Sequence, residues 1–288
     1  MQFPSIKMFS LAVAAAIALP LSSAATAGPV FLTGHDPDFH TQPGLGNAGN
    51  LLAKALSFVT GGSYNDNLAS TKFLWVESAI AAPGGHVKGY NSLDDVGASA
   101  VDYDIVDAAG FATAVLSNYT AIAIASSFGG TLTRAELDAL IARKTDIAAF
   151  INAGGGLFAS SECYPCGANL MAGATAPDLF GYLPVNVTSI GASPPFTPTA
   201  YGLGLGLTAG DLNDPTHNSF GLIGGLNVVD TDAAGNATTL AGVVNVGNGG
   251  FVPVPEPGTL ALAALALGAL AGASRRRAKN AISATAAL

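Results

Sequence analysis

The chain has few charged residues, and few of those are basic. Only 10% of its 288 residues are charged, with 11 Lys and Arg against 19 Asp and Glu. Between residues 28 and 253, six basic side chains stand against eighteen carboxylates, a net charge near −12. Such a surface repels a phosphate backbone, which excludes nucleic acid as a partner. It could hold divalent cations or repel anionic polysaccharide, and composition does not decide between the two.

Cysteine is also scarce. The chain has only Cys163 and Cys166, so a disulfide-rich scaffold is excluded and stability must come from packing. A structural zinc site would need two further ligands close by, and there is no other cysteine to supply them. In an oxidising compartment the C-x-x-C spacing favours a short-loop disulfide between the two. Redox catalysis by the same pair is the alternative.

Both ends of the chain carry apolar segments. Near the start, Lys7 precedes an apolar run from Met8 to Leu21, and Ala25-Thr26-Ala27 then offers a cleavage site. This pattern predicts a signal peptide over residues 1–27. Near the other end, Gly258 to Ala273 contains no charged residue. A helix of that length would reach roughly 24 Å, which is short for a permanent membrane span.

The residues around this second segment form a three-part pattern. Pro255-Glu256-Pro257 precedes it, and the basic residues Arg275, Arg276 and Arg277 follow it, on the side that the positive-inside rule places in the cytoplasm. The pattern resembles the PEP-CTERM sorting signal, and an ordinary C-terminal anchor is the alternative. The resemblance implies recognition by an exosortase, a membrane peptidase-transferase that processes the tail during export. The protein would then pass through the inner membrane of a Gram-negative bacterium to the periplasm or the outer cell surface.

These ends divide the chain. We expect a signal peptide at 1–27, one α/β ectodomain at 28–248, a spacer at 249–253, the sorting signal at 254–279, and a tail extension at 280–288 that the motif does not explain. An ectodomain of this length can bury a sizeable core. Membrane contact through the C-terminal helix is expected only before processing.

Within the ectodomain, short apolar runs alternate with helical patterns. Strands are expected at 30–33, 72–77 and 157–160, and at 104–106, 119–126 or both; helices are expected at 47–59 and over 134–151, the second with a capping box of Thr133 and Glu136. This alternation predicts a three-layer α/β fold with a mostly parallel, flavodoxin-like sheet flanked by helices. Later short strands at 183–187, 226–230 and 240–246 predict a Gly-rich β extension with an antiparallel edge.

The segment from Ile151 to Glu162 runs from a helix through a Gly-rich turn into a strand. With the alternation before it, this is similar to class I glutamine amidotransferase-like and trehalose-utilisation (ThuA-like) proteins. In amidotransferases the elbow after this strand is Gly-x-Cys-x-Gly. Here Ser161 takes the elbow position, both flanking glycines are absent, and Cys163 comes two places later. With these departures, the resemblance implies a divergent, non-catalytic domain. The resemblance of the tail to a sorting signal implies that this domain works at the envelope or in the exopolysaccharide matrix.

The strongest candidate site is Gly34-His35-Asp36-Pro37-Asp38-Phe39-His40, directly after the first expected strand. Imidazoles and carboxylates this close together suit a divalent metal ion, with His35, Asp36 and His40 as ligands and His217 from a later loop. The alternative is that they are turn residues whose imidazoles bind backbone groups. We expect His35 to line an open cleft with few core contacts.

Ser161 and Glu162 follow a later strand and are expected at the same sheet edge, because parallel strands align their carboxyl ends. A hydrolase triad could combine Ser161 with His35 or His217 and with Glu162 or Asp36. The alternative is that Ser161 and Glu162 cap the following turn. A divergent hydrolase, with or without a metal ion and acting on a carbohydrate or amide, is therefore the second functional hypothesis.

Overall fold

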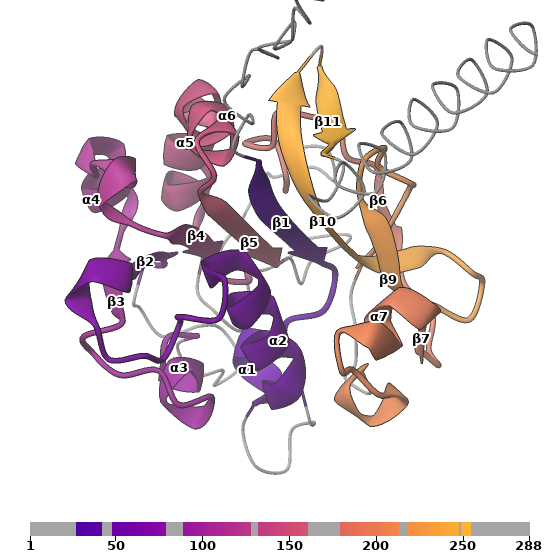
Figure 1. Ribbon diagram of the computed structural model, residues 1–288. Coiled ribbons are helices and arrows are strands. Elements are labelled where there is room, and N and C mark those ends of the chain that lie inside the picture. Colours follow the sequence, from indigo (N-terminus) through magenta and orange to yellow (C-terminus); the bar gives the residue numbers. More distant parts are fainter. Residues whose placement is uncertain are drawn as a thin grey trace, which may run out of the picture.

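The computed structural model describes residues 27–41, 48–78, 89–127, 132–160, 179–212, 218–247 and 249–254. In these ranges a mixed eleven-stranded sheet carries helices on both faces (Figure 1). The main path through the sheet is β3-β2-β4-β5-β1-β10-β8-β6. The predicted α/β class is confirmed, with a parallel half and an antiparallel half that meet at β1.

The parallel half contains the strands that the sequence pattern predicts. They are β1 (Gly28–Thr33), β2 (Phe73–Val76), β3 (Tyr103–Val106), β4 (Ala121–Ile124) and β5 (Gly156–Ser160). Both candidate segments for the third strand are present, as β3 and β4. Their spatial order is β3-β2-β4-β5-β1, with every neighbouring pair parallel. This is the flavodoxin order if β1 is counted last instead of first, which makes it a circular permutation of that order.

The antiparallel half extends the sheet beyond β1. It comprises β6 (Ser189–Gly191), β7 (Thr197–Pro198), β8 (Asn218–Phe220), β9 (Asn227–Thr231), β10 (Ala237–Gly247) and β11 (Gly250–Pro253). Long strand β10 pairs with β1 along one edge and with β9 and β11 along the other. The predicted β extension is therefore present. Gly250–Pro253, expected to lie in a spacer, form β11.

One predicted strand is wrong. Residues 183–187 form bends and irregular chain, and the next strand begins only at Ser189. The apolar side chains that suggested a strand are buried, since Leu183 is inaccessible, but the backbone N–H of Leu183 donates to Phe180 O in a turn. Pro184 has no N–H to give to a sheet ladder. Burial in this segment therefore arises without strand pairing.

Helices cover the two faces of the sheet. On one face lie α1 (Pro37–His40), α2 (Gly49–Thr60) and α3 (Asn91–Asp95). On the other lie α4 (Ala108–Thr113), α5 (Arg134–Ala142) and α6 (Lys144–Asn152). Helix α7 (Ala200–Gly204) packs beside β9, and short 3₁₀ turns lie at Ala69–Thr71, Leu116–Asn118 and Ala209–Leu212. Each face has its own apolar core, as alternating strand side chains require.

The expected helix over 134–151 is two helices. Thr133 and Glu136 form the predicted capping box at the start of α5. The helix stops at Arg143, whose φ of −101° and ψ of 18° leave the helical region. There the Arg143 guanidinium donates to the carbonyls of Phe111 and Ala114 at 2.6 and 2.9 Å. The break between α5 and α6 thus places the Arg143 guanidinium beside the C-terminal end of α4.

A close backbone contact fixes the loop that follows β1. Gly34 N donates to Thr238 O at 2.8 Å, and Asn218 N donates to Gly34 O at 3.2 Å. A Cβ atom at residue 34 would lie 1.9 Å from the carbonyl oxygen of Asn218, so only glycine fits. The chain is thereby held between β10 and β8 just before the His- and Asp-rich motif begins.

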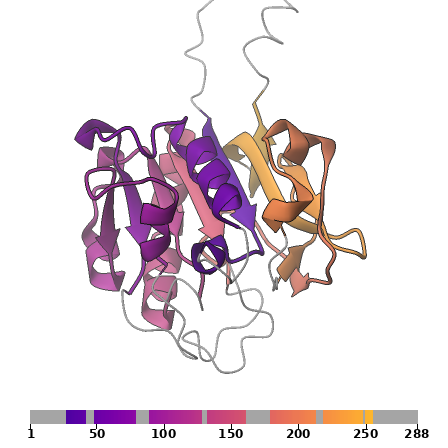
Figure 2. The ribbon, with the colours of Figure 1, turned by 90° about the horizontal axis from the view of Figure 1, so that it is seen from below.

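The first and last described strands begin and end at one edge of the sheet. Gly28 opposes Val244 on one side of β10, and Pro253 opposes the same Val244 on the other side. Figure 2 shows the start of β1 and the end of β11 close together at this edge, away from the end of β1 where the motif lies. β11 therefore ends at the amino edge of the parallel strands.

Candidate functional site

Polar side chains gather where the parallel strands end. After β1 the chain turns through Asp36 into α1, and Asp38 Oδ2 accepts a hydrogen bond from Ser126 N at 2.8 Å. Ser126 follows β4, and β5 lies between β4 and β1 in the sheet. The Asp38 carboxylate therefore reaches from the end of β1 to the end of β4, past the carboxyl end of β5. This edge is where open α/β sheets place their ligands.

The Asp38 carboxyl has an altered proton affinity at this edge. Desolvation by burial raises its pKa to about 7, and the nearby Asp36 adds to the rise, against the hydrogen bond from Ser126 that lowers it. Its Oδ1 has no hydrogen-bond partner among the described residues. A buried carboxyl with one unused oxygen, titrating near neutrality, can bind a hydrogen-bond donor or exchange a proton.

His35 does not lie in an open cleft, which corrects the expectation from the sequence. Its side chain is fully buried, its Nε2 lies 3.0 Å from Asp230 Oδ2, and its ring packs edge-on against Phe196. Asp230 belongs to β9 and is fully buried as well. The pair joins the loop after β1 to the antiparallel half. We therefore assign His35 a structural role.

His40 forms a second, separate contact. Its Nε2 lies 3.1 Å from Oδ1 of Asp36, the residue before the short helix α1, and the angles of this contact do not make an aligned hydrogen bond. The two imidazoles are thus matched to different carboxylates. Among the described residues, no group of three His, Cys, Asp or Glu side chains is arranged to hold a metal ion. The metal site stays a prediction because its fourth candidate ligand, His217, lies outside the described ranges.

The remaining predicted site residues also fall outside the described ranges. These are Ser161, Glu162, Cys163 and Cys166. The structure does show that Ser160, immediately before them, is in register with Thr33 at the end of β1, and that its hydroxyl donates to Ile124 O at 3.0 Å. The strand that leads to Ser161 and Glu162 therefore ends at the same edge as β1. The amidotransferase-like elbow and the disulfide stay predictions.

Sequence reasoning missed other polar residues at this edge. Glu77, directly after β2, is fully buried and accepts hydrogen bonds from Trp75 Nε1 at 2.7 Å and Tyr90 N at 2.9 Å. Ser127, just beyond β4, is buried, and its hydroxyl has no hydrogen-bond partner among the described residues. Both follow short apolar strands in the sequence. A search for polar residues at the end of each predicted strand and directly after it would have found them.

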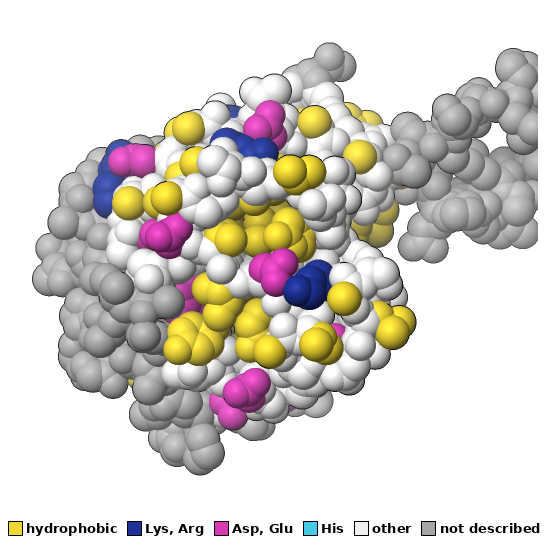
Figure 3. Space-filling view, turned by 90° about the vertical axis from the view of Figure 1, so that its left-hand side faces the viewer, with side chains coloured by type: hydrophobic (Ala, Val, Ile, Leu, Met, Phe, Trp, Pro, Cys, Tyr) yellow, Lys and Arg dark blue, Asp and Glu magenta, His cyan; other side chains and the backbone are white. Residues whose placement is uncertain are grey.

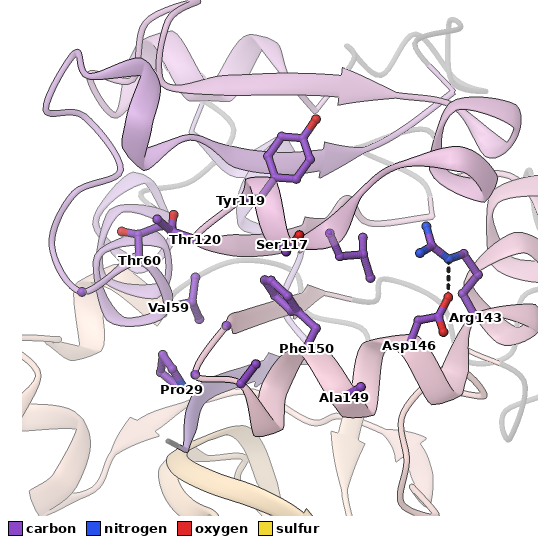
Figure 4. A pocket seen from close by; sticks show the side chains of 15 residues that line it. Pro29, Val59, Thr60, Ser117, Tyr119, Thr120, Arg143, Asp146, Ala149 and Phe150 are labelled. Atoms are coloured by element: carbon purple, nitrogen blue, oxygen red, sulfur yellow. Dashed lines mark hydrogen bonds and ion pairs between the residues drawn. The ribbon is translucent and has the colours of Figure 1, made fainter. Parts of the chain in front are cut away.

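A cavity of about 720 Å³ lies at the opposite, amino edge of the sheet, where no site was expected. Figure 4 shows Val59 and Phe150 among its lining side chains, with the Arg143–Asp146 pair toward one end. The Arg143 guanidinium donates to Asp146 Oδ2 at 2.8 Å and to two backbone carbonyls, so groups within the protein balance its positive charge. The lining offers mainly apolar contact, with no arrangement suited to proton transfer.

The described surface agrees with the acidic composition. Viewed from the edge at β3, apolar side chains gather in the middle of the face, acidic side chains lie among them, and basic side chains are few (Figure 3). This face offers no basic stripe for a nucleic acid. Within the described ranges, no helix has the length and apolar character needed to cross a bilayer.

Residues 253–277 match the PEP-CTERM protein-sorting motif, which confirms the resemblance drawn from Pro255-Glu256-Pro257, the apolar segment and the basic cluster. The motif implies export, processing by an exosortase and sorting to the cell surface. Comparison with curated proteins and with solved structures finds no match to the chain. The resemblance of the ectodomain to amidotransferase-like and ThuA-like proteins gains no support from these comparisons.

The His35–Asp230 pair predicts a large, coupled effect on stability. His35→Ala should lower the free energy of unfolding by about 3 kcal/mol, because it leaves the Asp230 carboxylate buried without its imidazole. Asp230→Asn in the same background should recover part of that loss, since a neutral amide costs less to bury. Urea denaturation of the four proteins of this double-mutant cycle measures both effects. An unchanged midpoint for His35→Ala would show that the pair does not hold the two halves together.

Asp38 predicts a pH dependence with a definite sign. Its pKa is about 7 when folded against an ordinary value of 3.8, so the folded state holds the proton more tightly. The associated stability is complete below pH 4 and is lost as pH rises to 7. Asp38→Asn should remove this slope and make the protein more stable at pH 8, by on the order of 3 kcal/mol. Asp138→Asn, which alters an exposed carboxylate on α5, is the control and should leave the slope in place.

Proposed function

We propose that the exported chain delivers its α/β domain to the cell envelope, where the domain acts as a non-catalytic binding module for extracellular polysaccharide. The single observation that carries delivery is the sorting motif at residues 253–277, which adjoins the last strand of the domain. Polysaccharide is the ligand class that the surface destination of this motif favours. The structure contributes the candidate site at the carboxyl edge.

The side chains at that edge suit a hydroxyl-rich ligand. Asp38 Oδ1 and the Ser127 hydroxyl are buried without hydrogen-bond partners among the described residues, and Asp36 and His40 lie on the same short helix as Asp38 or next to it. Carboxylates accept from sugar hydroxyls, and a serine hydroxyl both donates and accepts. The net negative charge of the domain favours a neutral or cation-bridged polysaccharide over a freely anionic one.

A divergent hydrolase is the second candidate, and one observation favours it. The Asp38 carboxyl, with a pKa of about 7, is matched to general acid or base catalysis at neutral pH. Ser161 and Glu162 remain candidates for the other catalytic groups, with His217 as a further one. A carbohydrate or amide bond would be the substrate.

The delivery proposal predicts the fate of a variant in which Pro255-Glu256-Pro257 is replaced by three alanines. In a host that contains an exosortase, this chain should remain unprocessed in the inner membrane, because the enzyme loses its recognition residues. Cell fractionation and the intact mass of the protein measure the outcome. The single substitution Glu256→Ala tests whether the carboxylate is the essential part. Exosortase sorting would be refuted if the triple variant reached the cell surface with the same processed mass as the wild-type protein, apart from the three substitutions.

The binding and hydrolase alternatives predict different behaviour of Asp38→Asn. If the edge only binds polysaccharide, wild type should co-sediment with polysaccharide from the host's own matrix without releasing soluble sugar, and the variant should bind it several-fold more weakly. If the domain is a hydrolase, wild type should release reducing ends, and the variant should lose this activity by about 100-fold or more while still binding. Asp138→Asn is again the matched control and should behave as wild type.

A further inference from the structure

The sorting motif begins inside the folded domain. Its first residue, Pro253, is the last residue of β11 and opposes Val244 of β10. One residue further, Val254 N donates to Val243 O at 3.4 Å, which extends the pairing up to the residue before Pro255. Strand pairing therefore continues up to the residue before the Pro-Glu-Pro motif.

The hairpin of β10 and β11 has one apolar face that the described residues leave uncovered. Because side chains alternate along a strand, Val243 and Asn245 point to the same side as Val252 and Val254. Val243 is 48% exposed and Val252 is 47% exposed, and Val254 is partly exposed. Val244 and Phe251 point the other way into the core and are buried. We call Val243, Val252 and Val254 the valine face.

The position of this face limits what can cover it. Each extended residue advances the chain by about 3.5 Å, so Pro255, Glu256 and Pro257 all lie within roughly 11 Å of Val254 along the chain. An enzyme that binds these three residues must therefore lie next to the hairpin. Any such enzyme must therefore contact the end of β11 and the side chains beside it, unless the hairpin opens first.

We propose that the valine face is a docking surface for the exosortase that processes the tail. The face carries no charged side chain, which suits an apolar patch on an enzyme embedded in a membrane. It is small, so the contact it can make is that of a transient enzyme–substrate complex and not of a permanent assembly. This inference rests on the proposed sorting of the chain and adds a second recognition element on the folded domain.

The test is the rate at which full-length precursor is converted in a host that contains an exosortase. The variant is Val243→Thr with Val252→Thr, because threonine keeps the β-branched shape but reduces apolar contact. Conversion should slow by about threefold to tenfold. The matched control is Val101→Thr with Val115→Thr, two valines 46% and 59% exposed in the connections that precede β3 and β4, in the parallel half of the sheet. The control should convert at the wild-type rate, and equal urea midpoints should show that both variants fold.

A second variant separates docking from simple obstruction. Ten Gly and Ser residues inserted between Val254 and Pro255 move the motif away from the valine face. Docking predicts slower conversion of this chain, whereas faster conversion would show that the folded hairpin only hinders the enzyme and would overturn the proposal. Wild-type conversion of Val243→Thr with Val252→Thr would overturn it too. Neither result affects the sorting proposal, which fails only if the chain lacking Pro255-Glu256-Pro257 is still processed.

Discussion

The structure depends on the double pairing of β1. This strand binds β5 in parallel on one side and β10 antiparallel on the other, and Val30, Phe31 and Leu32 at its centre are fully buried. The parallel half comes from residues before 161 and the antiparallel half from residues after 188, so β1 is the shared member of two sheets that would otherwise have open edges. Its register places Thr33 beside both Ser160 and Thr239.

That register also determines the chemistry at the carboxyl edge. Directly after Thr33, the close contact at Gly34 sends the chain across the edge, where His35 reaches β9 and Asp38 reaches the end of β4. Burying several carboxylates so close together costs solvation energy, which the protein offsets with the His35 imidazole and backbone N–H groups. For Asp38 the desolvation is not fully offset, and burial raises the pKa of its carboxyl to about 7 despite the hydrogen bond from Ser126. The free energy stored there makes this carboxyl responsive to a ligand or to pH.

The sequence predicts the elements of the parallel half well, because their signals are local. A buried apolar run such as 121–124 and a capping box such as Thr133 with Glu136 depend on neighbouring residues only. Sheet order is not local. No local feature of the sequence near residue 30 indicates that this strand pairs with residues 239–244. The antiparallel partner of β1 and the permuted strand order could therefore not be predicted from the hydrophobic pattern.

The candidate site was predicted in the same uneven way. The motif from His35 to His40 does lie at the carboxyl edge, as a strand followed by polar residues indicates. The burial of His35 was missed because its partner, Asp230, is 195 residues away and belongs to a strand whose position depends on the unpredicted half. Glu77 was missed because it was read only as the end of a strand. For His35, the missing information was a long-range pairing and not the chemistry of the residue.

The double pairing of β1 has a consequence for the order in which the domain can fold. Residue 28 is synthesised early, but one of its two partner strands, β10, ends only at Gly247, a few residues before the sorting motif. β1 can therefore pair with only one of its two neighbouring strands until nearly the whole domain has been synthesised. Such long-range closure is slow compared with local helix formation. Completion of the fold therefore depends on residues that lie just before the sorting motif, and the incomplete chain leaves one edge of β1 unpaired until they are available.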